Sequence, residues 1–351
     1  QYRLITMNSL HSFAFGLATH NSSAELIEAF YPMPYLNPSA ALSSLLASTF
    51  ALAAQSNNTY TVERDTAAHL AVELEALGES RLATQLSAMS ASEQTVIACL
   101  VSVDAPPQSI PEAFLKLHLL SHRHVLPHQL NLNGMFGVLK NLAWTNLGPI
   151  DLDDLPALQL AARLEGKFIN VETVDKFPKM TNYVVPRGVR IADAARVRLG
   201  AHLGEGTTVM HEGFVNFNAG TKGAAMIEGR ISAGVIVDET SDLVGGCSTM
   251  GTLSGGGTEI ISVGKNCLIG ANAGIGFPLA DGCIIEAGLY VTAGTKVQLL
   301  DATGSLSKTA KALELASLND MLFRRNSISG AVECVPLKTS MSLNEELHSN
   351  D

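Results

Sequence analysis

Apolar residues return at every sixth position between Val185 and Val297. The count holds as far as Val215, resumes at Ile231 after a slip of four residues, and recovers twice more further along the chain. An amphipathic helix repeats about every 3.6 residues and a strand every two, so neither explains a period of six. A chain wound as a triangular prism does, because each face takes six residues and its apolar member points at the axis. The pattern predicts such a prism over residues 183–300, built on Val185, Ile191, Val197, Leu203, Val209, Val215, Ile231, Val237, Leu243, Val263, Ile269, Ile275, Ile285, Val291 and Val297.

The region before the prism predicts two further domains. Residues 1–115 are predicted to form an α/β domain, because an opening apolar stretch is followed by helical patterns at Asp65–Leu77 and Ser80–Met89. Residues 116–182 are predicted to be a mainly helical linker domain, with a later helix at Asp151–Leu164.

The region after the prism, residues 301–351, predicts a small C-terminal domain. Its pattern favours a helix at Lys308–Leu318, followed by a strand pair at Met321–Leu337 that turns at Ser329-Gly330. The last dozen residues are polar, which is typical of a loose tail.

Composition disfavours two classes of partner. Apolar residues make up 46% of the 351 residues, yet no uncharged apolar stretch reaches the length of a membrane span, so no membrane partner is expected. The nearest candidate, Ala40–Ala54, is predicted to be a buried helix. A net charge of −10 disfavours a nucleic-acid partner.

The cysteines and the amino terminus indicate the compartment. The five cysteines are scattered and form no C-x-x-C pair, which is typical of a reduced protein. No signal-peptide pattern is evident at the amino terminus. We therefore expect a cytoplasmic protein.

Breaks in the count of six predict loops that bind ligands. The first break is assigned to Asn216–Gly223, directly after His211-Glu212-Gly213. The second runs from Gly245 to Gly257 and is dense in glycine, so its backbone N–H groups are candidates for binding an anion or an oxyanion. A flexible corner loop explains the same glycines equally well.

Three motifs carry a resemblance to a known family. They are Met210–Thr221 (MHEGFVNFNAGT), Glu228–Val235 (EGRISAGV) and Met250–Gly257 (MGTLSGGG). The chain resembles tetrahydrodipicolinate N-succinyltransferase, in the longer form typified by actinobacteria and pseudomonads. The likeness is close over residues 115–335 and loose in the N-terminal domain. Further matching stretches are Ile269–Asn272, Glu286–Thr295 and Leu322–Ser327.

The resemblance implies a fold, an assembly and a reaction. The expected fold is a left-handed parallel β-helix in a homotrimer, with active sites between subunits. The implied reaction moves a succinyl group from succinyl-CoA onto the amino group of ring-opened tetrahydrodipicolinate, giving N-succinyl-2-amino-6-oxopimelate and CoA in lysine and diaminopimelate synthesis. Succinyl-CoA is then a co-substrate, and neither a metal nor a permanently bound cofactor is expected.

Glu212 and Gly234 are the catalytic candidates that the resemblance implies. The glutamate of the His-Glu-Gly motif is the family's catalytic residue, assigned as the carrier of an acyl anhydride. Chemistry also allows a plainer role, because an attacking amine must lose a proton and a carboxylate can accept it. Gly234 matches the region that offers a backbone N–H to the thioester oxyanion, and a corner glycine is the alternative reading.

Substrate binding requires cations and hydroxyl groups, because the dicarboxylate acceptor and the succinyl tail are anionic. Arg230 is a candidate through its planar fork of hydrogen-bond donors, and Ser232 through its hydroxyl. Gly229 and Asn218 complete the predicted substrate-binding set. A lone arginine on a prism face more often makes a surface ion pair.

CoA binding is assigned to the later coils. Gly255, Gly270 and Ala271 are small enough for a thin pantetheine arm to lie against the backbone. Lys296 and Lys311 are the candidates for its phosphates, although exposed lysines usually do nothing specific.

Histidine spacing leaves other functions open. His118 and His122 lie four apart, as do His124 and His128, which is the spacing of metal ligands on a helix, but Pro127 interrupts the pattern and structural roles are favoured. Alternation along a strand predicts that His211 points away from Glu212.

Three alternatives follow. Another CoA-dependent acyltransferase on the same prism usually relies on a catalytic histidine. A γ-type carbonic anhydrase needs three histidines around zinc, whereas the predicted prism holds only His202 and His211. A purely structural β-helix needs no glycine-rich insertion.

Overall fold

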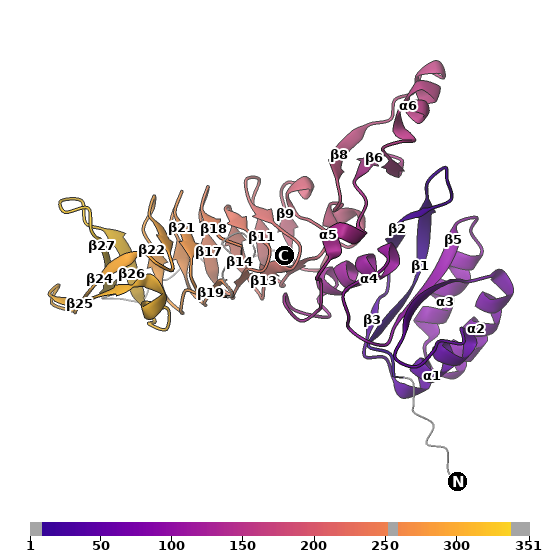
Figure 1. Ribbon diagram of the computed structural model, residues 1–351, viewed down its shortest axis with the longest axis horizontal. Helices are drawn as coiled ribbons and strands as arrows, with labels where there is room; N and C mark the ends of the chain where they lie inside the picture. Colours follow the sequence, from indigo (N-terminus) through magenta and orange to yellow (C-terminus); the bar gives the residue numbers. More distant parts are fainter. Residues whose placement is uncertain (1–8, 252–258, 338–351) are drawn as a thin grey trace, which may run out of the picture. The chain divides into compact units, whose positions relative to one another are not determined.

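The computed structural model describes residues 9–251 and 259–337, which form two compact units (Figure 1). Unit 1 comprises Gln1–His124 and Leu130–Pro178, and unit 2 comprises Val125–Gln129 and Lys179–Asp351. The predicted Gly255 lies outside the described residues. Within the described ranges, no helix is both long and apolar enough to cross a membrane.

Unit 1 is built on an antiparallel sheet in the order β2-β1-β5-β4, with β3 also paired to β1. Alternate residues of its central strands, such as Phe13 and Phe15, pack into a core with three helices. A fourth helix lies against β2 and β5. The strands are β1 (Ser12–His20), β2 (Leu26–Phe30), β3 (Tyr35–Leu36), β4 (Asn57–Thr61) and β5 (Thr95–Val101). The helices are α1 (Ala40–Thr49), α2 (Arg64–Ala76), α3 (Ser80–Ser90) and α4 (Ile110–Ser121), and their bounds confirm the helices predicted at 65–77 and 80–89.

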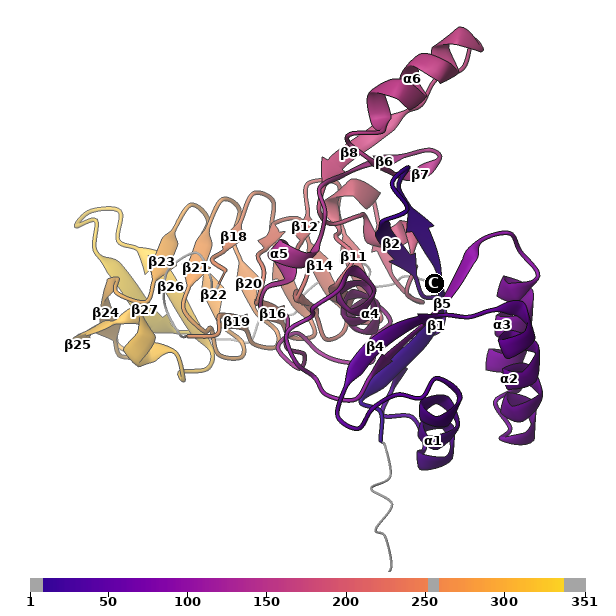
Figure 2. The ribbon, with the colours of Figure 1, turned by 45° about the vertical axis from the view of Figure 1, so that its right-hand side comes forward.

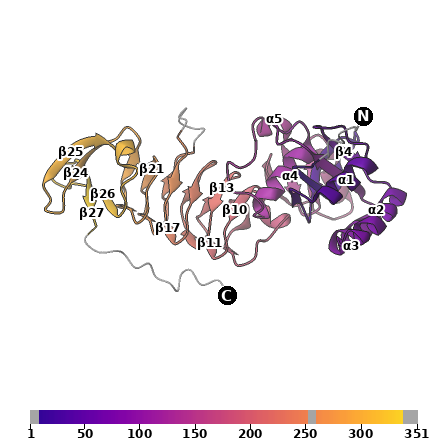
Figure 3. The same ribbon diagram turned by 90° about the horizontal axis from the view of Figure 1, so that it is seen from below.

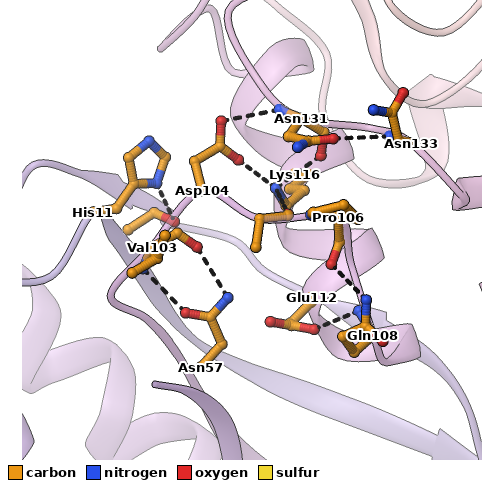
Figure 4. Close-up of polar contacts among 12 residues, drawn as sticks. His11, Asn57, Val103, Asp104, Pro106, Gln108, Glu112, Lys116, Asn131 and Asn133 are labelled. Carbon is orange, nitrogen blue, oxygen red and sulfur yellow. Dashed lines mark hydrogen bonds and ion pairs between the residues drawn. The ribbon is translucent and has the colours of Figure 1, made fainter. Parts of the chain in front are cut away.

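The fourth helix, α4, carries a buried cation that is fully paired (Figure 4). Ser109 caps its first turn by accepting from the backbone N–H of Glu112. One turn further on, the Lys116 side chain is only 2% exposed, and its ammonium pairs with the Asp104 carboxylate. It also donates to the carbonyls of Ala105 at 2.8 Å and Asn131 at 2.9 Å. All three donors of the ammonium are therefore satisfied, which a buried lysine requires.

The region predicted to be a mainly helical linker contains a second antiparallel sheet instead. Strand β6 (Leu142–Thr145) pairs with β7 (Gly148–Asp151) and β8 (Val171–Asp175). Short helix α5 (Met135–Val138) precedes it and α6 (Leu155–Leu164) follows β7. All of α6 is described, and none of its residues is buried. The turn to β7 needs the left-handed backbone of Gly148, at φ 95°, a hairpin signal that the helical reading passed over.

Unit 2 is a three-sided parallel β-helix, whose stacked coils are seen in Figure 2. Each coil contributes one short strand to each of three parallel sheets. The first sheet holds β9 (Arg190–Ile191), β11 (Thr207–Val209), β14 (Ala225–Ile227), β17 (Ser241–Leu243), β20 (Leu268–Ile269) and β22 (Ile284–Ile285). The second holds β12 (Phe214–Val215), β15 (Arg230–Ile231), β18 (Ser248–Thr249), β21 (Gly274–Gly276) and β23 (Tyr290–Thr292). The third holds β10 (Ala201–Leu203), β13 (Ala219–Thr221), β16 (Ile236–Val237) and β19 (Ser262–Val263).

The predicted column of apolar residues fills the axis of this prism. From Val197 to Val297 every predicted member of the column is at most 1% exposed. Val185 is 67% exposed, because it precedes β9 and no coil covers it.

The break predicted at Asn216–Gly223 is wrong, since β13 crosses it and the count continues through Thr221 and Ile227. Thr221 is 1% exposed, and its hydroxyl bonds Thr207 Oγ1 at 2.6 Å, so a polar residue takes an axial place without an unmet hydrogen bond.

The C-terminal region caps the prism with strands (Figure 3). Strands β24 (Lys296–Leu300) and β25 (Leu306–Lys311) pair antiparallel, as do β26 (Met321–Arg325) and β27 (Val332–Pro336). The strand pair predicted at 321–337 is confirmed. The helix predicted at 308–318 is wrong: this segment holds β25 and a single 3-10 turn, because pairing with β24 overrides its local helical preference.

Candidate functional site

A polar cavity lies along one edge of the prism. We name this the first edge; it is formed by the turns β11–β12, β14–β15 and β17–β18, which stack because their strands pair in register. The cavity, called the edge pocket below, measures about 430 Å³. It is lined by Asp193, Arg196, His211, Glu212, Glu228, Gly229, Arg230, Gly246 and Cys247.

Glu212 is held rigidly by its backbone while its side chain stays available. The guanidinium of Arg196 donates to the carbonyls of Glu212, at 2.6 Å, and Gly213, at 3.1 Å. A Cβ at Gly213 would lie 2.3 Å from the Ile227 carbonyl, so only glycine allows this turn to sit against the next coil. Among the described residues, none donates a hydrogen bond to the Glu212 carboxylate, which is exposed to the pocket. The carboxylate can therefore accept a proton or attack a carbonyl carbon.

The other two carboxylates of the edge pocket are committed to the fold. Glu228 Oε2 accepts from the backbone N–H of Gly245 at 3.2 Å, and Asp193 Oδ1 accepts from Ala195 at 3.0 Å. A Cβ at Gly245 would lie 3.5 Å from Glu228 Oε2 and 4.0 Å from Glu212 Oε2, so both glutamates converge on this glycine. Glu212 is thus the uncommitted member of the set.

Arg230 is the uncommitted cation of the edge pocket. Its side chain is exposed, and no described residue hydrogen-bonds to its guanidinium. Arg196, by contrast, is engaged with backbone carbonyls. An arginine whose planar fork has no protein partner is suited to a carboxylate ligand.

His211 lines the same pocket as Glu212, which corrects the prediction that it points away. Residues 210–213 form a turn between β11 and β12. The alternation of side chains holds only along a strand, so it does not apply here.

Gly229 is required by packing. A Cβ there would lie 2.2 Å from Cys247 Sγ. Burial, with a smaller contribution from Glu228, raises the pKa of the Cys247 thiol to about 12, so this cysteine is a neutral packing group in the pocket wall.

Three other predicted residues lie at a different edge. Asn218, Ser232 and Gly234 are in the turns that follow β12 and β15, which we name the second edge. The Ser232 hydroxyl donates to the Thr249 carbonyl at 2.6 Å. The Gly234 N–H donates to the Asn218 carbonyl at 2.9 Å, so an oxyanion at this amide would have to share or replace that bond.

Sequence reasoning missed His128 as part of the second edge. Its backbone N–H donates to Asn218 Oδ1 at 2.9 Å, and its Nε2 bonds the Gly234 carbonyl at 2.6 Å. The residue lies about 90 positions before Asn218. No spacing rule in the sequence connects the two.

The residues predicted to bind CoA fall into two places. Gly270 and Ala271 follow β20 on the first edge, where a Cβ at Gly270 would lie 2.5 Å from the Ala287 nitrogen. Lys296 and Lys311 are directly opposite each other across β24 and β25. The sheet order puts six strand steps between β14 and β24, or about 29 Å at a strand spacing of about 4.8 Å.

His118, the histidine of α4, is structural. His118 Nδ1 bonds the Phe114 carbonyl at 2.7 Å and its Nε2 accepts from the Tyr31 N–H at 3.2 Å, so both nitrogens are used. Burial lowers its pKa to about 3. In the prism, His202 Nδ1 bonds the Val125 carbonyl at 2.8 Å. Within the described ranges, no three His, Cys, Asp or Glu residues gather as metal ligands would.

Comparisons with known proteins agree with one another. The profile "Tetrahydrodipicolinate N-succinyltransferase middle" matches residues 139–179, and "Hexapeptide repeat of succinyl-transferase" matches residues 260–293. The 2,3,4,5-tetrahydropyridine-2,6-dicarboxylate N-succinyltransferase of Pseudomonas paraeruginosa is 58% identical, over 98% of this chain and 99% of that protein. The enzyme of the same name from Vibrio cholerae is 52% identical, over 97% of this chain and 99% of that protein.

A solved structure extends the agreement to three dimensions. It is described as a 2,3,4,5-tetrahydropyridine-2-carboxylate N-succinyltransferase from Campylobacter jejuni, and it superposes with a TM-score of 0.87 at 33% identity. The superposition covers 94% of this chain and 93% of that one. Identity above one half over nearly the whole length settles the family: this chain belongs to the 2,3,4,5-tetrahydropyridine-2,6-dicarboxylate N-succinyltransferases.

Proposed function

We propose that this protein transfers a succinyl group from succinyl-CoA to the amino group of ring-opened tetrahydrodipicolinate, releasing CoA. The product, N-succinyl-2-amino-6-oxopimelate, belongs to lysine and diaminopimelate synthesis. Family membership supports the reaction. The observation that carries the mechanism is the Glu212 carboxylate, which stands uncommitted in the edge pocket beside the uncommitted Arg230.

Glu212 acts as the base in this proposal. The amine nitrogen attacks the thioester carbonyl, a C–N bond forms and the C–S bond breaks. The amine proton passes to the Glu212 carboxylate, and the CoA thiolate leaves and takes up a proton. The family's covalent alternative, a Glu212 acyl anhydride, uses the same free carboxylate but releases CoA before the acceptor binds.

Arg230 holds a substrate carboxylate, while Gly229 lets the adjoining wall pack against Cys247. A guanidinium offers two parallel donors to a carboxylate and so fixes its orientation as well as its charge. Truncating Arg230 is therefore expected to raise KM for the dicarboxylate more than KM for succinyl-CoA.

The active site is completed between subunits of a homotrimer of left-handed β-helices. In support, the candidate residues of one chain are divided between two edges: Glu212, Gly229 and Arg230 on the first, Asn218, Ser232 and Gly234 on the second. One chain by itself does not gather both sets around the edge pocket. A neighbouring copy that presents its second edge to the first edge would do so.

CoA follows the coils beyond the edge pocket. Gly270 and Ala271 continue the first edge with two small residues, which suits a thin pantetheine arm that lies along the prism. Lys296 and Lys311 face each other, and two like charges in register favour a bound phosphate that relieves their repulsion. Gly255 is proposed to contact CoA as well. A cytoplasmic location fits five cysteines that are all free and buried.

The experiment is an assay of thiol release from succinyl-CoA. We expect CoA release only when tetrahydrodipicolinate or 2-aminopimelate is present. A burst of one CoA per site without acceptor would favour the anhydride route. Release that ignores the amine would contradict the assignment.

A second candidate is another acyltransferase that uses histidine, favoured by the presence of His211 in the edge pocket. A panel of sugar amines and serine as acceptors, with acetyl-CoA as donor, separates the two. The proposed enzyme should leave that panel unacylated.

A further inference from the structure

The turn that carries Glu212, residues 210–213, is bonded to the following coil through backbone groups. The Met210 N–H donates to the Ile227 carbonyl at 2.8 Å. The Phe214 N–H, directly after the turn, donates to the Gly229 carbonyl at 3.0 Å. Each of these bonds joins a backbone N–H to a carbonyl one coil further on, which is how neighbouring coils of the prism are held together.

The preceding coil breaks this series of backbone bonds. An isolated bridge one residue further on sets Arg196 beside Phe214 in the register of the second sheet. In that register the Arg196 N–H would meet the Gly213 carbonyl. It donates instead to the Asp193 carbonyl at 3.1 Å, inside a short 3-10 turn. Among the described residues, no backbone N–H donates to the Gly213 carbonyl.

The Arg196 side chain replaces the missing backbone donor. Its Nε donates to the Gly213 carbonyl at 3.1 Å and its Nη2 to the Glu212 carbonyl at 2.6 Å, so one guanidinium holds two consecutive peptides. The Asp193 carboxylate accepts from the Ala195 N–H at 3.0 Å and caps the 3-10 turn that presents this arginine. A planar fork of donors fixes two acceptors at once, whereas the ammonium of a lysine is a point charge on a flexible stem.

The position of the Glu212 carboxylate depends on this backbone contact. The side chain is exposed in the edge pocket, and no described residue hydrogen-bonds to it. Its direction therefore follows from the backbone of the turn, which Arg196 holds. Displacing a reacting group by about 1 Å can cost roughly 10²-fold in rate.

We propose that Arg196 is a positioning residue of the succinyl transfer, which acts through Glu212 rather than by binding a substrate. The inference rests on the proposed function and adds to it the residue that sets the place of the base. Loss of Arg196 should therefore lower kcat and leave the KM values unchanged, because Arg230 and the later coils bind the two substrates.

The test is steady-state kinetics of CoA release by Arg196→Gln and Arg196→Lys. Both should lower kcat by at least about tenfold, with KM for succinyl-CoA and for the dicarboxylate within about twofold of the wild type. Lysine keeps the charge without the fork, so a wild-type kcat in Arg196→Lys would overturn positioning by the fork. A raised KM for the dicarboxylate at unchanged kcat would make Arg196 a binding residue and would also overturn the proposal.

A double variant shows whether Arg196 acts through Glu212. In the Glu212→Gln protein, the further change Arg196→Gln should lower kcat by less than about threefold, because the carboxylate that Arg196 positions is already gone. A loss as large as in the wild-type background would mean an independent role and would overturn the inference. Calorimetric binding of succinyl-CoA checks that each variant is folded, and Arg196→Lys carries the test if Arg196→Gln does not fold.

Arg198→Gln is the matched control. Arg198 comes from the same coil and bonds the Asn216 side chain at 3.1 Å on the following coil, but it does not line the edge pocket. Its replacement should leave kcat within about twofold of the wild type. A wild-type protein that releases no CoA would overturn the proposed function and this inference together. An active wild type with an unimpaired Arg196→Gln variant would overturn the inference alone.

Discussion

At the residue scale, most of the ionisable side chains described above form hydrogen bonds or ion pairs that stabilise the fold. One of them, Glu212, keeps a carboxylate without such a bond among the described residues. Lys116 is buried with three partners, Glu228 and Asp193 bond backbone amides, and Arg196 clamps a turn. Glu212 lines the edge pocket together with Glu228, Asp193 and Arg196, but no described residue hydrogen-bonds to its carboxylate. A group held in place by its backbone, with its side chain unused, is suited to chemistry.

Glu212→Gln should lower turnover by roughly 10²-fold or more, because glutamine keeps the shape but neither accepts a proton nor attacks a carbonyl. Folding and succinyl-CoA binding should persist, since the side chain adds nothing to the axial column. Steady-state kinetics with a calorimetric titration of succinyl-CoA check both. Glu205→Gln, at an exposed glutamate outside the pocket, is the control. Near wild-type turnover in Glu212→Gln would show that a residue other than Glu212 is the catalytic base.

His118 should make unit 1 sensitive to acid. Its pKa is about 3 when folded and 6.5 as an ordinary histidine, so between these values the unfolded chain binds the extra proton. Stability therefore falls as pH drops below 6.5, by about 2 kcal/mol at about pH 5. Urea unfolding followed through Trp144, the single tryptophan, reports on unit 1.

The matched variants for this test are His118→Gln and His69→Gln. Replacing His118 should flatten the dependence on pH, although His122 contributes in the same direction. Replacing the exposed His69 should leave the slope unchanged. Equal slopes in all three proteins would mean that His118 does not set the acid sensitivity.

At the element scale, stacking of coils decides which residues are tolerated. The axial column tolerates threonine at position 221 because a second threonine completes its hydrogen bond. Gly220 tolerates nothing larger: its φ is 151°, and a Cβ would lie 1.8 Å from the His202 carbonyl on the adjacent coil. By contrast, among the described residues, no atom beyond the adjoining residues lies within 4 Å of a Cβ at Gly294.

Gly220→Ala should destabilise unit 2 by about 3 kcal/mol or more, because β10 and β13 must separate to admit the methyl group. Gly294→Ala should change stability by less than about 1 kcal/mol, since its site is open. Denaturant unfolding followed by far-UV circular dichroism measures both. Similar stabilities for the two variants would contradict the close approach of the coils.

At the scale of the whole molecule, the proposed active site requires assembly, because its candidate residues are divided between two edges of the prism. We expect a native mass of three times 37.0 kDa by analytical ultracentrifugation. A monomer with full activity would refute the shared site.

Mixed trimers test the sharing directly. Glu212→Gln is defective on the first edge and Asn218→Ala on the second, so each alone should be nearly inactive. Refolded together in equal amounts, they should recover up to about a quarter of wild-type activity, because some interfaces then pair two intact edges. No recovery above the separate proteins would place the whole site in one chain.

The sequence by itself determined the features that arise from a local repeat of apolar residues. The period of six predicted the prism and nearly all of its axial residues, because one position per face must be apolar whatever the rest of the chain does. The motifs identified Glu212 and Arg230, which the fold then brought into one pocket. The helices α2 and α3 followed from their own apolar spacing.

Tertiary structure decided what depends on pairing between distant segments. Residues 308–318 became a strand because β24 offered it a partner, and Thr221 took an axial place because Thr207 met its hydroxyl. His128 reached the second edge from far along the chain, and His211 entered the pocket because it lies in a turn. Such outcomes depend on hydrogen bonds and volumes that exist only once the coils are stacked, so no local pattern of residues could specify them.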